Sequence, residues 1–139
     1  MISPEQRAIL AGLADVLIPA GDGLPSASQS NVADRWLDEV LVALPEVDVP
    51  LTALLDRLRG VNSGVAVQAL QTEDPLGFDL LCTVVAGAYF LNPEVRQAIG
   101  YPGQLAVPIV PEDPPDYEQD GLLASVIARG PIYRPTPSS

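Results

Sequence analysis

Hydrophobic residues recur at helical spacing through the first hundred residues of the chain, and helix start and stop signals punctuate them. The first helix starts at Ser3, which suits an N-cap, followed by Pro4 at the first helical position and by Gln6 at the position that completes a capping box. Pro19 ends it, and a turn-rich loop occupies residues 19–30. Its apolar face comprises Ile9, Leu10, Leu13, Val16 and Leu17.

A second helix is predicted from about Val32 to Leu44, capped by Ser30 or Asn31 and closed by Pro45. Its apolar stripe comprises Val32, Trp36, Leu37, Val40, Leu41 and Leu44, which favours Trp36 as a core anchor over an interface anchor. A third helix starts near Pro50, behind Asp48, and finds a natural C-terminal residue in Gly60. Residues 64–71 indicate a short further helix. The third helix is expected to bury Leu51, Leu54, Leu55 and Leu58.

The most hydrophobic segment opens at Asp74-Pro75 and runs to about Leu91. Its residues are apolar on most sides, which predicts the central helix of the domain, and Cys82 within it is expected to be a small buried core residue. Asn92-Pro93 starts another short helix that ends at Gly100. No segment alternates with period two over enough residues to form a convincing strand. The predicted fold is all-α, a compact bundle of five or six helices over residues 1–100.

The character of the chain changes at Tyr101, because residues 101–139 hold eight of the fifteen prolines. Such a segment cannot form a long helix, although a short one fits near 121–129. It also carries regularly placed apolar residues, in which disordered chains are poor. We therefore expect a long Pro-rich extended C-terminal arm that lies partly on another protein and partly on the chain's own helices. The candidate interface residues are Tyr101, Pro102, Leu105, Val107, Ile109, Tyr117, Leu123, Ile127, Arg129, Ile132, Tyr133 and Arg134.

The charge balance narrows the choice of partner. The 139 residues carry a formal net charge of −11, with seven cationic side chains, all Arg, and no His. A nucleic-acid partner is excluded because phosphate contacts need clustered cations. Membrane insertion is not expected, since no apolar stretch approaches the ~20 residues that a span needs. The first residues resemble no export signal, so we expect a cytoplasmic protein, or a periplasmic one only if a signal-bearing partner carries it.

Candidate chemistry is sparse. Without His or Lys the chain lacks the commonest general base and the Schiff-base amine, and a lone Cys has no activating partner. Gly21-Asp22-Gly23 lacks the context of a phosphate-binding loop. The acidic stretch 112–120 lacks the glycine and closing Glu of a calcium loop, and it suits a solvated segment or a strip facing partner arginines. We therefore predict no catalytic, cofactor-binding or metal-binding residue, and no enzyme activity in this chain.

Two parts of the chain resemble a known family. The first comprises residues 13–23 (LADVLIPAGDG), 25–28 (PSAS) and 32–34 (VAD), and the second comprises residues 89–96 (YFLNPEVR) and 99–103 (IGYPG). Together they cover about a third of the sequence, and they resemble the opening and the later motif of the gluconate 2-dehydrogenase subunit 3 family.

The resemblance implies a non-catalytic small subunit of an FAD-dependent dehydrogenase of the glucose-methanol-choline type. The large subunit would hold the FAD and oxidise a sugar or an alcohol, and a cytochrome c subunit can then accept the electrons. The small subunit would stabilise or mature the flavoprotein. Many relatives carry a twin-arginine signal, which this sequence lacks. The alternative is a stand-alone helical interaction or regulatory module.

Overall fold

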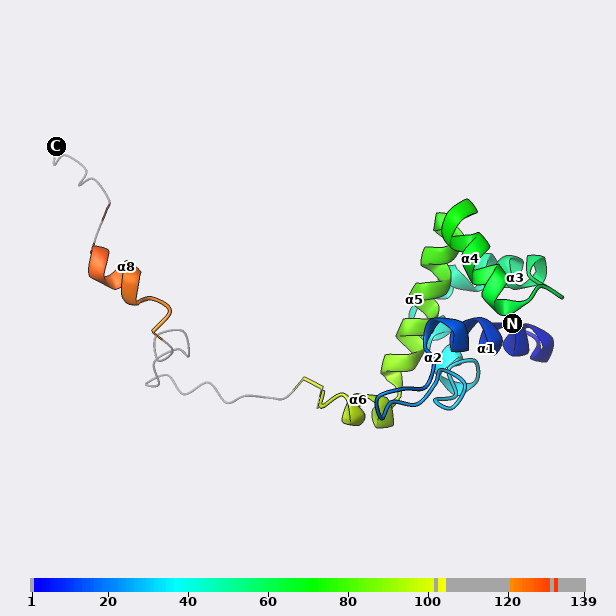
Figure 1. The fold of residues 1–139 in the computed structure, drawn as a ribbon, viewed down its shortest axis with the longest axis horizontal. Helices are drawn as coiled ribbons and strands as arrows, with labels where there is room; N and C mark the ends of the chain where they lie inside the picture. The colour runs from blue at the N-terminus through cyan, green and yellow to red at the C-terminus, as the bar shows by residue number, and fades with distance from the viewer. Residues whose placement is uncertain (1, 102, 105–120, 131, 133–139) are drawn as a thin grey trace. The chain divides into compact units, whose positions relative to one another are not determined.

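The structure is a computed structural model that describes residues 2–101, 103, 104, 121–130 and 132. The chain divides into two units, residues 1–103 and 104–139, which we describe separately (Figure 1). In the first unit, here called the helical body, the elements are α1 (Pro4–Leu17), α2 (Arg35–Ala43), a 3-10 turn η1 (Pro45–Val47), α3 (Asp48–Arg57), α4 (Ser63–Glu73), α5 (Pro75–Leu91) and α6 (Pro93–Ala98). The second unit holds α8 (Ala124–Arg129).

The predicted fold class is confirmed, because six α-helices form the helical body and the described residues include no strand. The only pairing of β type among them is an isolated bridge between Gly21 and Leu24. No described helix combines the length and the hydropathy that crossing a membrane requires. Most of the predicted arm lies outside the described residues.

Helix starts follow the caps that the sequence predicts. The Ser3 hydroxyl accepts a hydrogen bond from the Gln6 backbone N–H, and the Gln6 side chain accepts one from the Ser3 N–H at 2.8 Å, so the capping box at α1 is complete. The Asp74 side chain accepts from the Gly77 N–H at the start of α5. The Asn92 side chain accepts from the Glu94 N–H at the start of α6. Each of these three caps satisfies a backbone donor that the helix itself leaves unpaired.

The start predicted for the second helix is wrong by three residues. Residues 31–34 form turns and α2 begins at Arg35, with no side-chain cap from Asp34. The Ser30 hydroxyl is unavailable as a cap because it donates to the carbonyl oxygen of Ser26. The Arg7 guanidinium donates to the carbonyl oxygens of Ala33 and Asp34 at 2.8 and 3.0 Å. These tertiary hydrogen bonds hold the segment as a turn in place of the first helical turn that local propensity favours.

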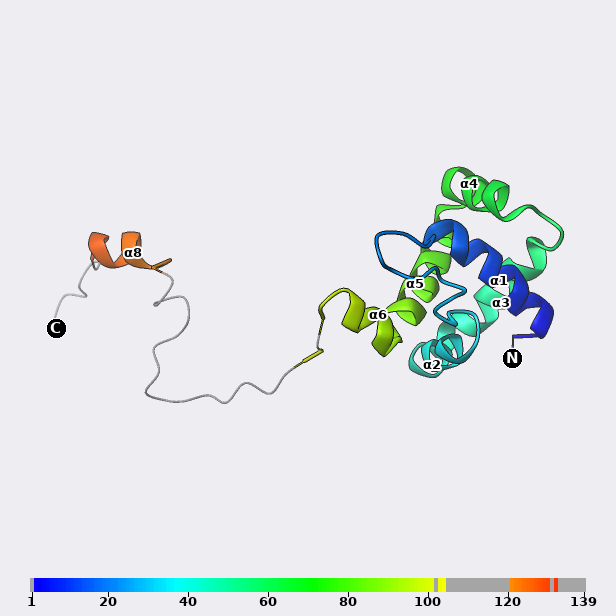
Figure 2. The same cartoon turned by 60° about the horizontal axis from the view of Figure 1, so that its bottom comes forward.

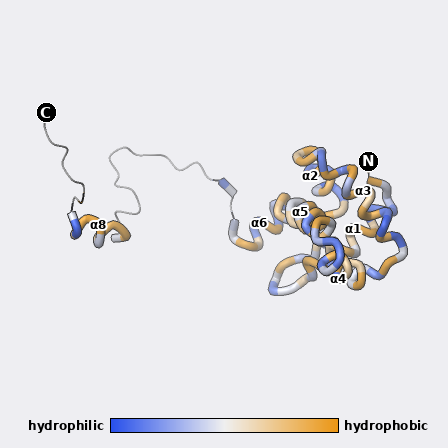
Figure 3. The backbone as a smooth tube through the Cα atoms, turned by 90° about the horizontal axis from the view of Figure 1, so that it is seen from above, coloured by the Kyte–Doolittle hydropathy of each residue, from blue (hydrophilic) through white to orange (hydrophobic). Residues whose placement is uncertain are grey.

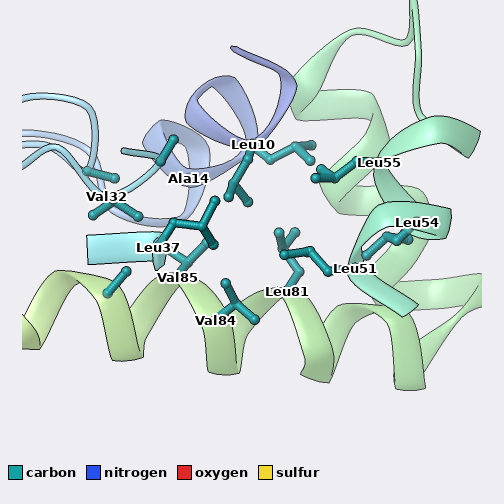
Figure 4. Packing of buried hydrophobic residues seen from close by; sticks show 14 of the residues in the cluster. Leu10, Ala14, Val32, Leu37, Leu51, Leu54, Leu55, Leu81, Val84 and Val85 are labelled. Carbon is teal, nitrogen blue, oxygen red and sulfur yellow. The ribbon is translucent and has the colours of Figure 1, made fainter. Parts of the chain in front are cut away.

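Helix α5 is central to the bundle, as predicted. It contacts α2, α3, α4 and α6 (Figures 1 and 2). Leu81, Val84 and Val85 lie on its inner side and face residues of α1, α2 and α3 (Figure 4). Burial of each such side chain contributes roughly 1.5–3 kcal/mol relative to exposure. The large fully buried side chains of those three helices are Leu10, Leu13, Leu37, Leu51 and Leu55.

Two residues of α5 differ from expectation. Leu76, near the start of the helix that was predicted to be apolar on most sides, is largely exposed. Cys82, predicted to be buried, is half-buried. Desolvation by the surrounding side chains, together with the nearby Asp79 carboxylate, raises the pKa of the Cys82 thiol. Because α5 packs on the bundle with one side only, its apolar residues on the other side reach the surface.

Candidate partner interface

The predicted interface residues divide into two groups. One group lies outside the described residues and comprises Pro102, Leu105, Val107, Ile109, Tyr117, Tyr133 and Arg134. Of the remainder, Tyr101 follows α6 on the helical body, whereas the other four belong to α8 and its flanks. Of these four residues, Leu123 is half-buried, and Ile127, Arg129 and Ile132 are exposed.

Helix α8 presents exposed apolar side chains. None of its residues is buried, and Ile127 is 69% exposed. Leu123 and Ile127 are four residues apart and therefore share one helix face. Figure 3 shows the hydrophobic colouring of α8, and Arg129 is the last residue of this helix. A short amphipathic helix of this kind fits an apolar groove on another protein.

Tyr101 is held in a defined position at the end of α6. Gly100 adopts a left-handed φ of 73° and donates its N–H to the carbonyl oxygen of Gln97 at 3.0 Å. The Tyr101 N–H donates to the carbonyl oxygen of Arg96 at 2.8 Å. These two bonds form a Schellman motif, which ends the helix and fixes the direction in which the chain leaves it. The Tyr101 side chain itself is 51% exposed.

A shallow pocket lies beside this turn. Its volume is about 420 Å³, and its described lining residues are Pro93, Arg96, Gln97, Gly100 and Tyr101. Arg96 is the only charged residue among them. The pocket therefore combines one guanidinium, one amide and one aromatic ring on a helix end that is fixed by backbone hydrogen bonds.

Pro93 also lines a second pocket. It contains Trp36, the only tryptophan of the chain. Trp36 is half-buried against the core, and the Arg35 guanidinium carbon lies 4.7 Å from its ring centroid, within cation–π range. The two acidic residues Asp34 and Glu94 also line this pocket.

Three side chains hold the loop between α1 and α2 against this end of the body. The Tyr89 hydroxyl donates to the carbonyl oxygen of Pro25 at 2.7 Å. The buried Asn92 donates from its side-chain amide to the carbonyl oxygen of Ser30 at 3.2 Å. The Asp15 carboxylate accepts from the Ser28 N–H and hydroxyl at 2.8 and 2.6 Å.

The bonds to Asp15 affect its acidity. Partial desolvation acts to raise the pKa of this carboxyl, but the hydrogen bonds from Ser28 and a further one from Ser26 outweigh it and lower the pKa below its ordinary value. The loop is therefore anchored from α1 as well as from α5 and from the α5–α6 junction.

As a consequence, the two segments that contain the residues resembling a known family meet in space. Residues 13–34 supply the loop, and residues 89–103 supply the end of α5, helix α6 and the Schellman turn. Their contact is made by Tyr89 and Asn92. Pro93, the first residue of α6, lines both pockets. Figures 1 and 2 show α6 at the end of the helical body, where it adjoins α5.

The sequence alone does not point to Arg96, because pairing between charges is a tertiary property. Within the described part of the chain, most arginines of the helical body form ion pairs with carboxylates. The exceptions on the body are Arg35 and Arg96, and α8 adds Arg129, which is likewise without a pair. The ion pairs are Arg7 with Asp38, Arg57 with Asp74, and Arg59 with both Glu5 and Asp56.

The described residues contain no group of three or more side chains placed to hold a metal ion. Comparison with known proteins leaves the chain unassigned, since no protein-family model, curated protein or solved structure matches it.

Proposed function

We propose that this chain is the non-catalytic small subunit of a heteromeric FAD-dependent sugar or alcohol dehydrogenase. In this proposal the partner subunit holds the FAD and performs the oxidation. The small subunit stabilises or matures the flavoprotein by binding its folded form. A protein that binds only the folded state of its partner stabilises it by about 2.7 kcal/mol at a hundred times the dissociation constant.

The observation that carries the proposal is the meeting of residues 13–34 with residues 89–103. Residues 13–23, 25–28 and 32–34 of the first segment and residues 89–96 and 99–103 of the second resemble the gluconate 2-dehydrogenase subunit 3 family. The hydrogen bond from Tyr89 to Pro25 joins residues of both sets, and the one from Asn92 reaches Ser30, which lies between residues 25–28 and 32–34. A chance resemblance of two separate segments gives no reason for them to pack together. Their contact therefore supports one shared structural unit.

The surface chemistry agrees with a binding role. Tyr101, Trp36 and Arg96 lie around one short helix, and aromatic and arginine side chains dominate protein–protein hot spots. The exposed apolar side chains of α8 add a second surface that burial against a partner would stabilise. The sequence offers neither His nor Lys for proton transfer or covalent catalysis, and this too favours a partner as the catalyst.

Purification from the native host through a tagged copy of the full chain tests the proposal. We expect a stoichiometric partner that contains FAD and reduces a redox dye when supplied with a sugar or an alcohol. The isolated small subunit is expected to bind no flavin and to show no such activity. Removing the small subunit is expected to lower the thermal unfolding midpoint of the flavoprotein.

Two results would contradict the proposal. One is recovery of the chain alone, as a monomer or a homodimer by size-exclusion chromatography, which is the behaviour of a stand-alone module. The other is binding of FAD by the isolated chain.

A further inference from the structure

We propose that the Arg96–Tyr101 pocket is the point at which the helical body binds an acidic side chain, Asp or Glu, of the flavoprotein subunit. This inference rests on the proposed function and adds to it a docking site and the chemistry that the site recognises. The expected contact joins the Arg96 guanidinium to the partner's carboxylate, with the Tyr101 ring packed beside it.

Charge complementarity is the first argument. Arg96 lines its pocket without any described acidic neighbour and forms no ion pair with a described residue, in a chain whose net charge is −11. None of the ion pairs of the helical body includes Arg96, so its guanidinium is available to a carboxylate of another protein. A guanidinium presents a planar fork of N–H donors that matches a carboxylate in bidentate geometry.

The remaining unpaired arginines suit this role less well. Arg35 already packs on the Trp36 ring, and its pocket contains the carboxylates of Asp34 and Glu94, which would repel an incoming acid. Arg129 is the last residue of α8, a helix that also exposes Val126 and Ile127. Among the described arginines, only Arg96 lacks an ion-pair partner and also lines a pocket that has no described acidic side chain.

Preorganisation is the second argument. The Schellman bonds to the carbonyl oxygens of Arg96 and Gln97 fix the helix end, and Val95 is fully buried beneath it. Arg96 is half-buried, so part of its motion is already restricted before a partner binds. A side chain that is ordered in the free protein loses less entropy on binding.

The absence of lysine from the sequence allows a direct test by zero-length cross-linking. In the full-length chain, Arg96→Lys introduces the only side-chain amine, and a carbodiimide joins that amine to a carboxylate in contact with it. We expect a cross-link to an Asp or Glu of the flavoprotein in the purified complex, identified by mass spectrometry.

Arg57→Lys is the matched control. It places one amine on α3, at a different end of the body from α6 (Figures 1 and 2), beside its own ion-pair partner Asp74. The control is expected to couple within the chain and not to the flavoprotein. The N-terminal amine is common to both variants and provides an internal reference.

Affinity gives an independent readout. We expect Arg96→Gln to raise the Kd of the complex by about tenfold or more and to flatten its dependence on salt, whereas Arg57→Gln changes the Kd less than about twofold. Circular dichroism of Arg96→Gln is expected to match that of the unchanged chain.

The outcomes separate this inference from the proposed function. Failure of the unchanged chain to bind any flavoprotein overturns both. A complex that forms normally with Arg96→Gln and yields no cross-link from Arg96→Lys overturns the pocket assignment and leaves the proposed function standing. Coupling of the introduced amine only to carboxylates of the same chain also overturns the assignment.

Discussion

The hydroxyl of Tyr89 on α5 donates a 2.7 Å hydrogen bond to the carbonyl oxygen of Pro25, a residue 64 positions earlier in the chain. The Tyr89 ring is buried, so the bond satisfies two polar groups that packing removes from much of the solvent. It also ties the loop between α1 and α2 to the end of the body that carries the two pockets.

Tyr89→Phe removes the hydroxyl while keeping the ring. We expect a loss of about 1 kcal/mol in the free energy of unfolding, because the bond is lost and the Pro25 carbonyl keeps little access to water. The thermal midpoint should fall by about 4 °C. Urea unfolding followed by circular dichroism measures the change. Tyr101→Phe is the control, since the Tyr101 side chain is exposed and makes no described hydrogen bond. An equal loss in both variants would contradict the role of the bond.

The Asn92 side chain makes two kinds of hydrogen bond. Comparison with Asn62, which makes only one of them, separates their contributions to stability. Its side-chain oxygen caps α6 and its amide donates to the Ser30 carbonyl, whereas the exposed Asn62 only caps α4. We expect Asn62→Ala to cost about 1 kcal/mol and Asn92→Ala about 2–3 kcal/mol in the free energy of unfolding. Denaturant titrations of the two variants measure both costs. Equal costs would show that the bond to Ser30 contributes nothing to stability.

Gly12 lies where α1 crosses α4, and a Cβ built on it would come 2.7 Å from the Ser63 Oγ. In a free helix Gly→Ala stabilises by about 1 kcal/mol. We expect Gly12→Ala alone to gain little or nothing, since the Ser63 hydroxyl must move. Combined with Ser63→Ala, the same change should gain about 0.5–1 kcal/mol relative to Ser63→Ala alone. A double-mutant cycle of unfolding free energies tests this, and strict additivity would contradict the close approach.

Acid should weaken the fold through the aspartates whose pKa is lowered by hydrogen bonds. At Asp74 the Arg57 side chain is the main cause, followed by the Gly77 backbone N–H, and together they lower the pKa below its ordinary value of 3.8. A carboxyl whose pKa is lower in the folded state stabilises fully above its unfolded pKa, and this contribution is lost as the pH falls through the folded pKa. We therefore expect the urea midpoint to decrease as the pH falls below about 4.

The contribution of Asp74 can be isolated. Asp74→Asn retains an oxygen that caps α5 but cannot titrate, so it should reduce the stability difference between neutral and acidic solution. Asp79→Asn removes an exposed carboxylate on the same helix that has no described ion pair, and it serves as the control. An unchanged pH profile in Asp74→Asn would contradict the assignment.

Local signals predicted most of the helices. Ser3, Asp74 and Asn92 cap helices at the expected positions. Gly60 and Gly100 adopt left-handed φ values of 72° and 73°, which are typical of glycines that follow a helix end. These features depend on a few consecutive residues, so sequence alone reveals them. The central position of α5 followed equally from its continuous hydrophobicity.

Long-range contacts account for what the sequence did not predict. The turn at residues 31–34 depends on Arg7, which lies 26 positions from the carbonyl of Ala33 to which it donates. The pocket that contains Trp36 combines residues of two distant parts of the chain, 31–36 and 92–94. The lack of an ion pair at Arg96 depends on where the other described charges lie. No local pattern encodes these relationships.

The last prediction concerns the second unit. Deleting residues 105–139 removes α8 with its exposed Ile127 and leaves the six helices and the buried core of the body intact. We expect the truncated chain to retain helical circular dichroism and a cooperative unfolding transition, and to lose co-purification with the flavoprotein. Within the full chain, Ile127→Asp should weaken binding, because a carboxylate would have to be desolvated in an apolar groove.

Ser125→Asp is the matched control for Ile127→Asp, because it adds the same charge to α8 at a position that is already polar and exposed. Kd values from titration of the flavoprotein compare the two variants. If the truncated chain bound the flavoprotein as tightly as the full chain, the helical body alone would carry the affinity and the arm would have no part in it. Equal weakening by both variants would assign the effect to net charge, and not to burial of the α8 face.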